Sequence, residues 1–352
     1  MYIRGRVAPA LHPPVREGHA VKLVITIDTE EDNWRPFSTG IGTRNAQEIA
    51  RVHDLFMTEG VRPTYLITWP MALDDRLVDT LADENLQGHC EVGTHCHPWT
   101  TPPLGDVPRP ENSMLCNLPR ELVATKITAL HELITERFGV APRTFRAGRW
   151  GYGPAVADAL ARLNYRVDTS ITAYTDWSAQ FGPDYSLVGP KAFRFSPPHV
   201  FRPMEGGQMT ELPATVGFLT GDFSRRARFE RMARKPLIRW SRLIGILDAL
   251  ALHRRITLSP ECATTCDMID LIDSMQRRGF EHINLFFHSP SLLPGLTPYV
   301  KTRGDRDDFL QSLRTVIRHA RRCGITPILA RETVAPAPVV CAEAYAPDVS
   351  SS

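Results

Sequence analysis

The feature that most constrains the fold is an alternation of short apolar runs with longer helix-like segments from about residue 20 onward. Such alternation predicts parallel strands joined by crossover helices. Polar residues recur at the carboxyl ends of many of these runs, which favours a (β/α) barrel over an open sheet, because barrels carry their chemistry at that rim. The runs expected to form strands are 22–27, 63–68, 91–94, 143–147, 165–168, 209–213, 256–259, 282–287 and 326–329.

Longer segments between these runs have the spacing of amphipathic helices, and several end at a glycine, a common helix stop. They span residues 45–59, 74–85, 119–138, 154–163, 229–252, 264–278 and 305–323. Two proline-rich segments, 100–118 and 173–208, break the rhythm. Long irregular segments inside a compact domain are usually functional loops, so we expect both to overhang a site at the rim.

Composition fits one soluble globular domain, since 43% of the 352 residues are hydrophobic and no shift in composition marks a second domain. We expect an irregular segment at 1–19, a single barrel over 20–331 and an Ala/Pro-rich, disordered tail at 332–352.

The charge pattern gives no support to a nucleic-acid partner, because the formal net charge is +2 and no tail-sized block of like charge occurs. The N-terminus lacks the apolar core of a secretory signal, and no run approaches the length that spans a bilayer. Seven irregularly spaced cysteines argue against a secreted disulfide framework. We therefore expect a cytoplasmic protein without membrane insertion, and the sequence sets no oligomeric state.

Two histidines one residue apart follow the run at 91–94, in the sequence Gly-Thr-His-Cys-His-Pro-Trp at 93–99. Alternate side chains of an extended chain point the same way, so His95 and His97 can reach one metal ion together. A single buried histidine is often structural. Two on one face need two partners or one metal ion, and the pair therefore favours a metal site.

An acidic cluster, Asp28-Thr29-Glu30-Glu31-Asp32, follows the first apolar run. The same alternation puts Asp28 and Glu30 on one side. A lone aspartate after a strand is usually a turn or helix cap, but clustered carboxylates repel one another, so a cation or an arginine is expected nearby. Carboxylates and histidines at strand ends are the components of a metal-assisted hydrolase site.

Two further polar residues lie at strand ends. Arg146 precedes a glycine-rich turn, and we expect its guanidinium to pair with a carboxylate and hold it oriented. The alternative is an ordinary turn with a surface arginine. His288 follows the apolar run at 282–287. Alone it would be a weak signal, but beside the other three elements it is a candidate general acid.

Taken in order, these motifs resemble those of the polysaccharide deacetylases of the NodB-homology family, carbohydrate esterases that remove acetyl groups from sugar polymers. Segments 28–32, 93–103, 145–150 and 287–295 are similar to the motifs D-T-E-E-D, G-x-H-x-H-P-W-x-x-P-P, F-R-A-G-R-W and F-x-H-S-x-S-L-x-P-G of its WalW-like branch. The resemblance covers roughly residues 20–330. It implies a distorted (β/α) barrel with about seven parallel strands, a divalent metal, usually zinc, and an acetylated carbohydrate as substrate.

The resemblance also implies catalytic roles. Asp28 matches the family's catalytic base, Arg146 the arginine that tethers the base, and His288 the acid that protonates the leaving group. An aspartate usually tunes that histidine, and here Asp168 or Asp176 could do so.

For the metal, the resemblance implies His95 and His97 as ligands, although the family's histidines are usually four residues apart. A threonine replaces the aspartate that usually binds the metal. Glu30 is therefore the expected acidic ligand, with Glu31 or Asp32 as alternatives.

Trp99 and Trp150 offer flat apolar faces for a sugar ring, or they belong to the core. The His-x-His pair also resembles that of amidohydrolase barrels, but those need a bridging lysine and further histidines that the later runs lack. Two alternatives stay open: a cytoplasmic hydrolase of small amides in the same superfamily, and a barrel that lost its metal and binds glycan.

Overall fold

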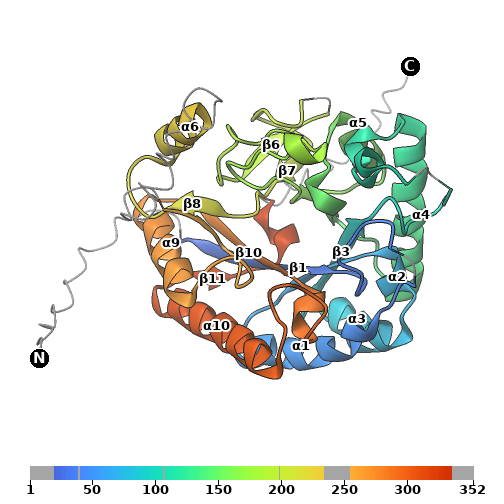
Figure 1. Ribbon diagram of the computed structural model, residues 1–352, viewed down its shortest axis with the longest axis horizontal. Helices are drawn as coiled ribbons and strands as arrows, with labels where there is room; N and C mark the ends of the chain where they lie inside the picture. The colour runs from blue at the N-terminus through green and yellow to red at the C-terminus, as the bar shows by residue number, and fades with distance from the viewer. Residues whose placement is uncertain (1–19, 39, 106–107, 198, 234–253, 335–352) are drawn as a thin grey trace, which may run out of the picture.

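The computed structural model describes residues 20–38, 40–105, 108–197, 199–233 and 254–334 (Figure 1). Its main sheet curls into an open barrel in which strands follow the order β10-β1-β2-β3-β4-β5-β7-β6, and β11 also pairs with β1. These strands are β1 (Lys22–Thr29), β2 (Thr64–Ile67), β3 (Glu91–Cys96), β4 (Thr144–Ala147), β5 (Val167–Asp168), β6 (Phe193–Phe195), β7 (Met209–Glu211), β10 (His282–His288) and β11 (Thr326–Pro327).

The seven strands from β10 to β7 are parallel, and β6 closes the edge in the antiparallel sense. This confirms the predicted distorted (β/α) barrel with about seven parallel strands. A separate antiparallel pair, β8 (Val216–Phe218) and β9 (Arg255–Thr257), lies between β7 and β10 along the chain.

Helices pack outside the sheet, and Figure 1 shows α9, α10, α1, α3 and α4 following one another around it. The α-helices are α1 (Ile49–Thr58), α2 (Trp69–Ala72), α3 (Asp75–Leu86), α4 (Arg120–Phe138), α5 (Pro154–Arg162), α6 (Phe223–Ala233), α9 (Thr265–Arg277) and α10 (Arg303–Arg322). Short 3-10 helices are η1 (Arg44–Glu48), η2 (Pro110–Ser113), η3 (Leu115–Asn117), η4 (Gly148–Trp150), η5 (Ser178–Gln180), η6 (Ser289–Leu292) and η7 (Ala330–Thr333).

Helix boundaries follow local chemistry. Thr302 forms a capping box with Asp305 at the start of α10, and Thr264 caps α9 by accepting from the Asp267 N–H. Gly139 ends α4 in the left-handed conformation. The apolar faces of these helices pack on the outward-facing side chains of the strands in one continuous core.

The sequence missed β6, β8 and the short helix α2, and it started the helix after β8 too late. That helix, α6, begins at Phe223, and the remainder of the predicted segment, 234–252, lies outside the described residues. The predicted segment 1–19 and most of the predicted tail also lie outside them. At the end of the described chain, η7 carries an ion pair between Glu332 and Arg62.

No helix among the described residues is both long and apolar enough to cross a membrane. The six cysteines in this part of the chain are free thiols.

Much of the interior of the barrel is polar, beside a small apolar cluster of Val24, Val167, Leu212 and Ala330. Near the amino ends of the strands, Glu91 accepts hydrogen bonds from the hydroxyls of Thr64 and Thr144, and burial raises the pKa of its carboxyl group. One layer higher, Thr26 donates to the side chain of Asn284. Buried polar groups are costly unless they are hydrogen bonded, so these layers fix which residues can stand next to one another inside the barrel.

The loop after β3 is fastened from outside the barrel by the buried Lys126 of α4. Its ammonium group donates to the carbonyl oxygens of Pro98 and Thr101 at 3.0 Å and of Pro103 at 2.6 Å. This helix therefore fixes the path of the chain that leaves the two histidines.

Candidate metal centre and catalytic residues

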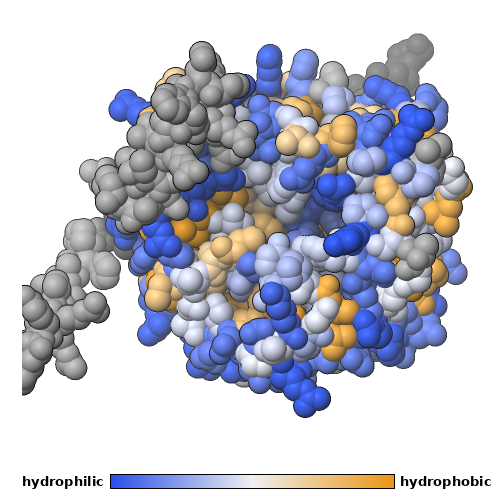
Figure 2. All heavy atoms as spheres, in the orientation of Figure 1, coloured by the Kyte–Doolittle hydropathy of each residue, from blue (hydrophilic) through white to orange (hydrophobic). Residues whose placement is uncertain are grey.

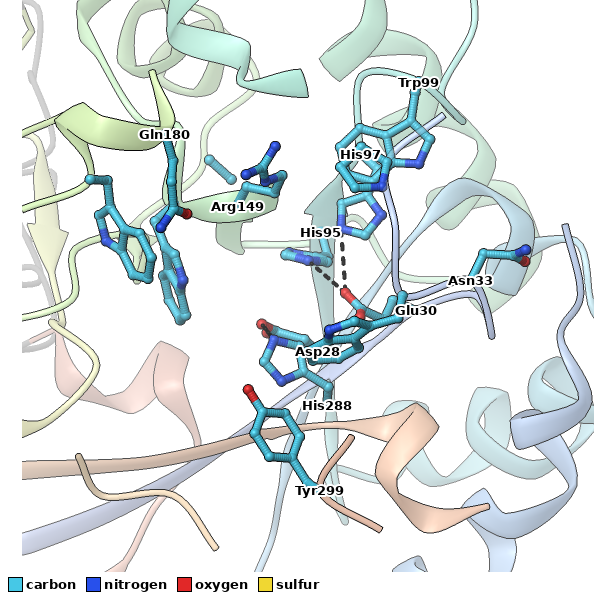
Figure 3. Close-up of a pocket in the computed structure, with 15 residues that line it drawn as sticks. Asp28, Glu30, Asn33, His95, His97, Trp99, Arg149, Gln180, His288 and Tyr299 are labelled. Carbon is cyan, nitrogen blue, oxygen red and sulfur yellow. Dashed lines mark ion pairs between the residues drawn. The ribbon is translucent and has the colours of Figure 1, made fainter. Parts of the chain in front are cut away.

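Three predicted ligands meet at the carboxyl end of the barrel. Oε2 of Glu30 lies 3.4 Å from Nε2 of His95 and 3.3 Å from Nε2 of His97 (Figure 3). All three residues are buried. Glu30 directly follows β1, His95 belongs to β3 and His97 follows β3, so adjacent parts of the rim supply the cluster.

The other nitrogen of each imidazole has a partner that only accepts hydrogen bonds. Nδ1 of His95 donates to the carbonyl oxygen of Arg146 at 3.1 Å, and Nδ1 of His97 donates to Oε1 of Glu31 at 2.8 Å. In neutral imidazoles, this arrangement leaves the lone pairs of both Nε2 atoms facing the carboxylate of Glu30.

These three lone-pair atoms repel one another unless a cation lies among them. The ligand set of two imidazoles and one carboxylate fits zinc and similar divalent ions, and the Nδ1 contacts are of the kind that orient metal-binding histidines.

The two other acidic residues considered as ligands lie elsewhere. Glu31 is buried and orients His97 from behind. Asp32 accepts from the backbone and side chain of Asn45 and pairs with Arg44 at 3.0 Å. The position of Glu30 among the imidazoles distinguishes it from both neighbours.

Asp28 lies beside the cluster and is held by Arg146, whose Nη1 donates to Oδ1 at 2.5 Å. The guanidinium also donates to the hydroxyls of Thr26 and Thr169 and to the Thr169 carbonyl. The side chain of Arg146 is fully buried, so these contacts supply the partners that a buried cation requires.

The second oxygen of Asp28 lies 3.5 Å from Nε2 of His288. Strand pairing explains this contact, because Asp28 and His288 are register partners on β1 and β10. Nδ1 of His288 contacts Oε2 of Glu261 at 2.7 Å, and its backbone N–H donates to the same carboxylate.

Glu261, rather than Asp168 or Asp176, is therefore the carboxylate that holds this histidine. Asp168 instead accepts from the hydroxyl of Ser170 at 2.8 Å, and Asp176 accepts from the Ser178 N–H at 2.9 Å. Sequence reasoning missed Glu261, although it lies just beyond the predicted strand at 256–259, at the same rim.

Burial and charge act in opposite directions on these groups. Burial alone would raise the pKa of Glu30, but the positive charge of His288 and hydrogen bonds from His95 and His97, when no metal ion is bound and their Nε2 atoms carry protons, bring it well below its ordinary value. Burial lowers the pKa of His288, while Glu261, Glu30 and Asp28 more than compensate and raise it to about 10. The carboxylates at this rim therefore favour a positive charge at its centre.

The site opens into a cavity of about 370 Å³. Besides the polar cluster, its walls carry the aromatic side chains of Trp34, Trp99, Trp150, Trp177 and Tyr299. Figure 2 shows that this face of the molecule is hollowed near its centre and is largely hydrophilic around the hollow. The combination of flat apolar walls and a few convergent polar groups is typical of a small-molecule or sugar site.

The two tryptophans predicted to contact substrate line the cavity and also support the site. Trp99 stacks on the ring of His97 with centroids 4.2 Å apart. The ring of Trp150 covers the guanidinium of Arg146 at 5.1 Å.

The turn after β4 brings backbone against the cluster. A β-carbon at position 148 would lie 2.4 Å from Cδ2 of His97 and 2.8 Å from the Cys96 carbonyl oxygen, so Gly148 permits a close approach that other residues would block.

No protein-family model and no curated protein matches this chain. Solved structures that are similar to it include a polysaccharide deacetylase from Mycobacterium smegmatis, with 14% identity over 92% of this chain and 97% of that one, at a TM-score of 0.46. A family 4 carbohydrate esterase from Streptomyces lividans, in complex with acetate, has 8% identity over 88% and 92% of the two chains, at 0.40. A CE4 family pseudoenzyme from Bacillus anthracis has 9% identity over 90% and 66%, also at 0.40.

The pairing of Arg146 with Asp28 predicts a strong energetic coupling. Replacing Arg146→Met leaves a buried carboxylate uncompensated and should lower the free energy of unfolding by about 3–5 kcal/mol. In the double variant with Asp28→Asn that charge is absent, so part of the loss should be recovered. Denaturant unfolding of the two single variants and the double variant measures the coupling. Arg143→Met, at an exposed position just before β4, is the matched control, and strictly additive costs would contradict the pairing.

Proposed function

We propose that this protein is a metal-dependent hydrolase that removes acetyl groups from an N- or O-acetylated carbohydrate. The observation that carries the proposal is the convergence of Glu30, His95 and His97 on one point, next to a carboxylate held by arginine and a histidine held by glutamate. The motifs of the NodB-homology deacetylases, in the WalW-like branch, support the same chemistry.

The proposed ion is zinc. Glu30, His95 and His97 would hold it, with Glu31 and the Arg146 carbonyl orienting the imidazoles. When bound, such an ion supplies Lewis-acid chemistry, which lowers the pKa of water and polarises a carbonyl group.

Asp28 is the proposed general base. Its carboxylate faces the cavity beside the cluster, and Arg146 keeps it oriented towards a water molecule that attacks the acetyl carbonyl carbon. His288 is the proposed general acid, which donates a proton from Nε2 to the departing amine or alkoxide. Glu261 binds Nδ1 and so presents Nε2 to the cavity.

The substrate-binding role of Trp99 and Trp150 is part of the proposal. Both rings line the cavity, where an aromatic face can stack against the apolar face of a sugar ring. Of the two leaving groups, we propose the amine first. The enzyme would then be a hydrolase of carbon–nitrogen bonds other than peptide bonds.

The direct test is acetate release from N-acetylglucosamine oligomers and from acetylated xylan by zinc-loaded protein. Release should stop with a chelator, and Asp28→Asn and His288→Asn should each reduce it on the order of a hundredfold or more. Asp32→Asn is the matched control, because that carboxylate faces Arg44 and Asn45 instead of the cavity, and it should retain activity.

Other outcomes distinguish the alternatives. If small amides release ammonia or acid and sugars release no acetate, the substrate is a small amide and not a carbohydrate. Glycan binding without acetate release from any substrate would make the protein a non-catalytic glycan-binding barrel.

The contact between His288 and Glu261 predicts a pH dependence. A general acid works only while it is protonated, so activity should fall as pH rises through the pKa of His288. Replacing Glu261→Gln removes the largest influence that raises this pKa, so the alkaline fall should move to lower pH. The profile of kcat against pH checks this. Glu332→Gln, which removes a surface ion pair with Arg62, is the control, and an unchanged alkaline limb in Glu261→Gln would contradict the assignment.

A further inference from the structure

Among the residues that the structure describes, one cation in the cavity, Arg149, lacks a partner of opposite charge. Asp28 is paired with Arg146, and His288 is paired with Glu261. Glu30 faces the imidazoles of His95 and His97. Arg149 also lines the cavity, and it forms no ion pair with any residue that the structure describes.

The only protein group that holds the guanidinium of Arg149 within the described chain is neutral, the hydroxyl of Ser113, which accepts from Nη1 at 2.5 Å. The side chain is half-buried, and burial lowers its pKa with no carboxylate acting against it. Placing a guanidinium in a partly desolvated site without a counter-charge is unfavourable, and an anionic ligand would remove that cost.

The backbone directs this side chain into the site. Arg149 has φ +53°, in the left-handed region that non-glycine residues rarely adopt, and the preceding residue, Gly148, packs against His97. Strained backbone of this kind is concentrated at ligand-binding sites. Figure 3 shows Arg149 and Gln180 on one side of the Glu30, His95 and His97 cluster, facing the open cavity, with Asn33 on the other side.

We propose that Arg149 binds an anionic substituent, a carboxylate or a phosphate, carried by the acetylated substrate. A guanidinium recognises either group through two parallel N–H donors. Gln180, on the same wall, adds a side-chain amide that can donate to such a substituent or to a sugar hydroxyl. The preferred substrate is therefore an acidic or phosphorylated acetylated sugar, whereas neutral acetylated sugars should bind more weakly. This inference rests on the proposed function for the identity of the substrate.

The test compares three probes that share one acetylated sugar: N-acetylglucosamine, N-acetylmuramic acid with its carboxylate, and N-acetylglucosamine 6-phosphate. Binding to zinc-loaded protein is measured by calorimetry, so the readout does not require turnover. In the wild type, at least one anionic probe should bind about tenfold or more tightly than the neutral sugar. Arg149→Met should abolish that difference, while Arg143→Met, at the opposite end of β4, should preserve it.

Equal affinity for all three probes in the wild type, or a preference that survives in Arg149→Met, would overturn the inference. Acetate release from the same probes separates this result from the proposed function. Tighter binding of an anionic probe without acetate release would support the anion site and contradict the proposed hydrolase activity. Release from all three probes at equal kcat/KM would keep the hydrolase and remove the anion site. If Arg149→Met lowers kcat equally on every probe, Arg149 acts on the acetyl group that all three share. That result would also overturn the inference.

Discussion

The site depends on one buried cation, the guanidinium of Arg146. It stands inside the barrel, and its side chain binds Asp28 and two threonines from β1 and the segment after β5. Its own carbonyl oxygen fixes the imidazole of His95 on β3. Because a buried charge must keep its partners, a single residue aligns the proposed base with a proposed metal ligand from a different strand. The parallel register reinforces this, since Arg146 and His95 are neighbours across β3 and β4.

Among the described residues, the four carboxylates of Asp28, Glu30, Glu31 and Glu261 lie at the site, and their contacts indicate different roles. Asp28 faces an arginine, whereas Glu30 faces two imidazoles, so one is suited to proton transfer and the other to binding a metal ion. Glu31 and Glu261 lie behind histidines and fix which ring nitrogen faces the cavity. Environments that differ in this way allow chemically identical groups to act as base, ligand and support within one cavity.

The sequence indicated the parts of this site that lie at the ends of strands. The alternation of side chains along a strand and the common rim of the barrel predict that Asp28, Glu30 and the two histidines lie close together. The structure places them side by side. Contacts made by loop residues cannot be predicted from this alternation. Glu261 reaches its histidine from a loop after β9, and the missed strand β6 forms inside a segment whose prolines suggested only a loop. That Arg149 has no counter-charge among the described residues is a property of its three-dimensional surroundings, which local sequence patterns do not contain.

The central claim is that Glu30, His95 and His97 hold one divalent ion. The most direct measurement is the zinc content of purified, zinc-supplied protein, compared with Glu30→Gln, His95→Ala and Asp32→Asn. The account predicts about one ion per chain in the wild type and in Asp32→Asn, and loss of the ion in the other two variants. A wild type that binds no zinc, or a Glu30→Gln variant that binds it as tightly as the wild type, would contradict it.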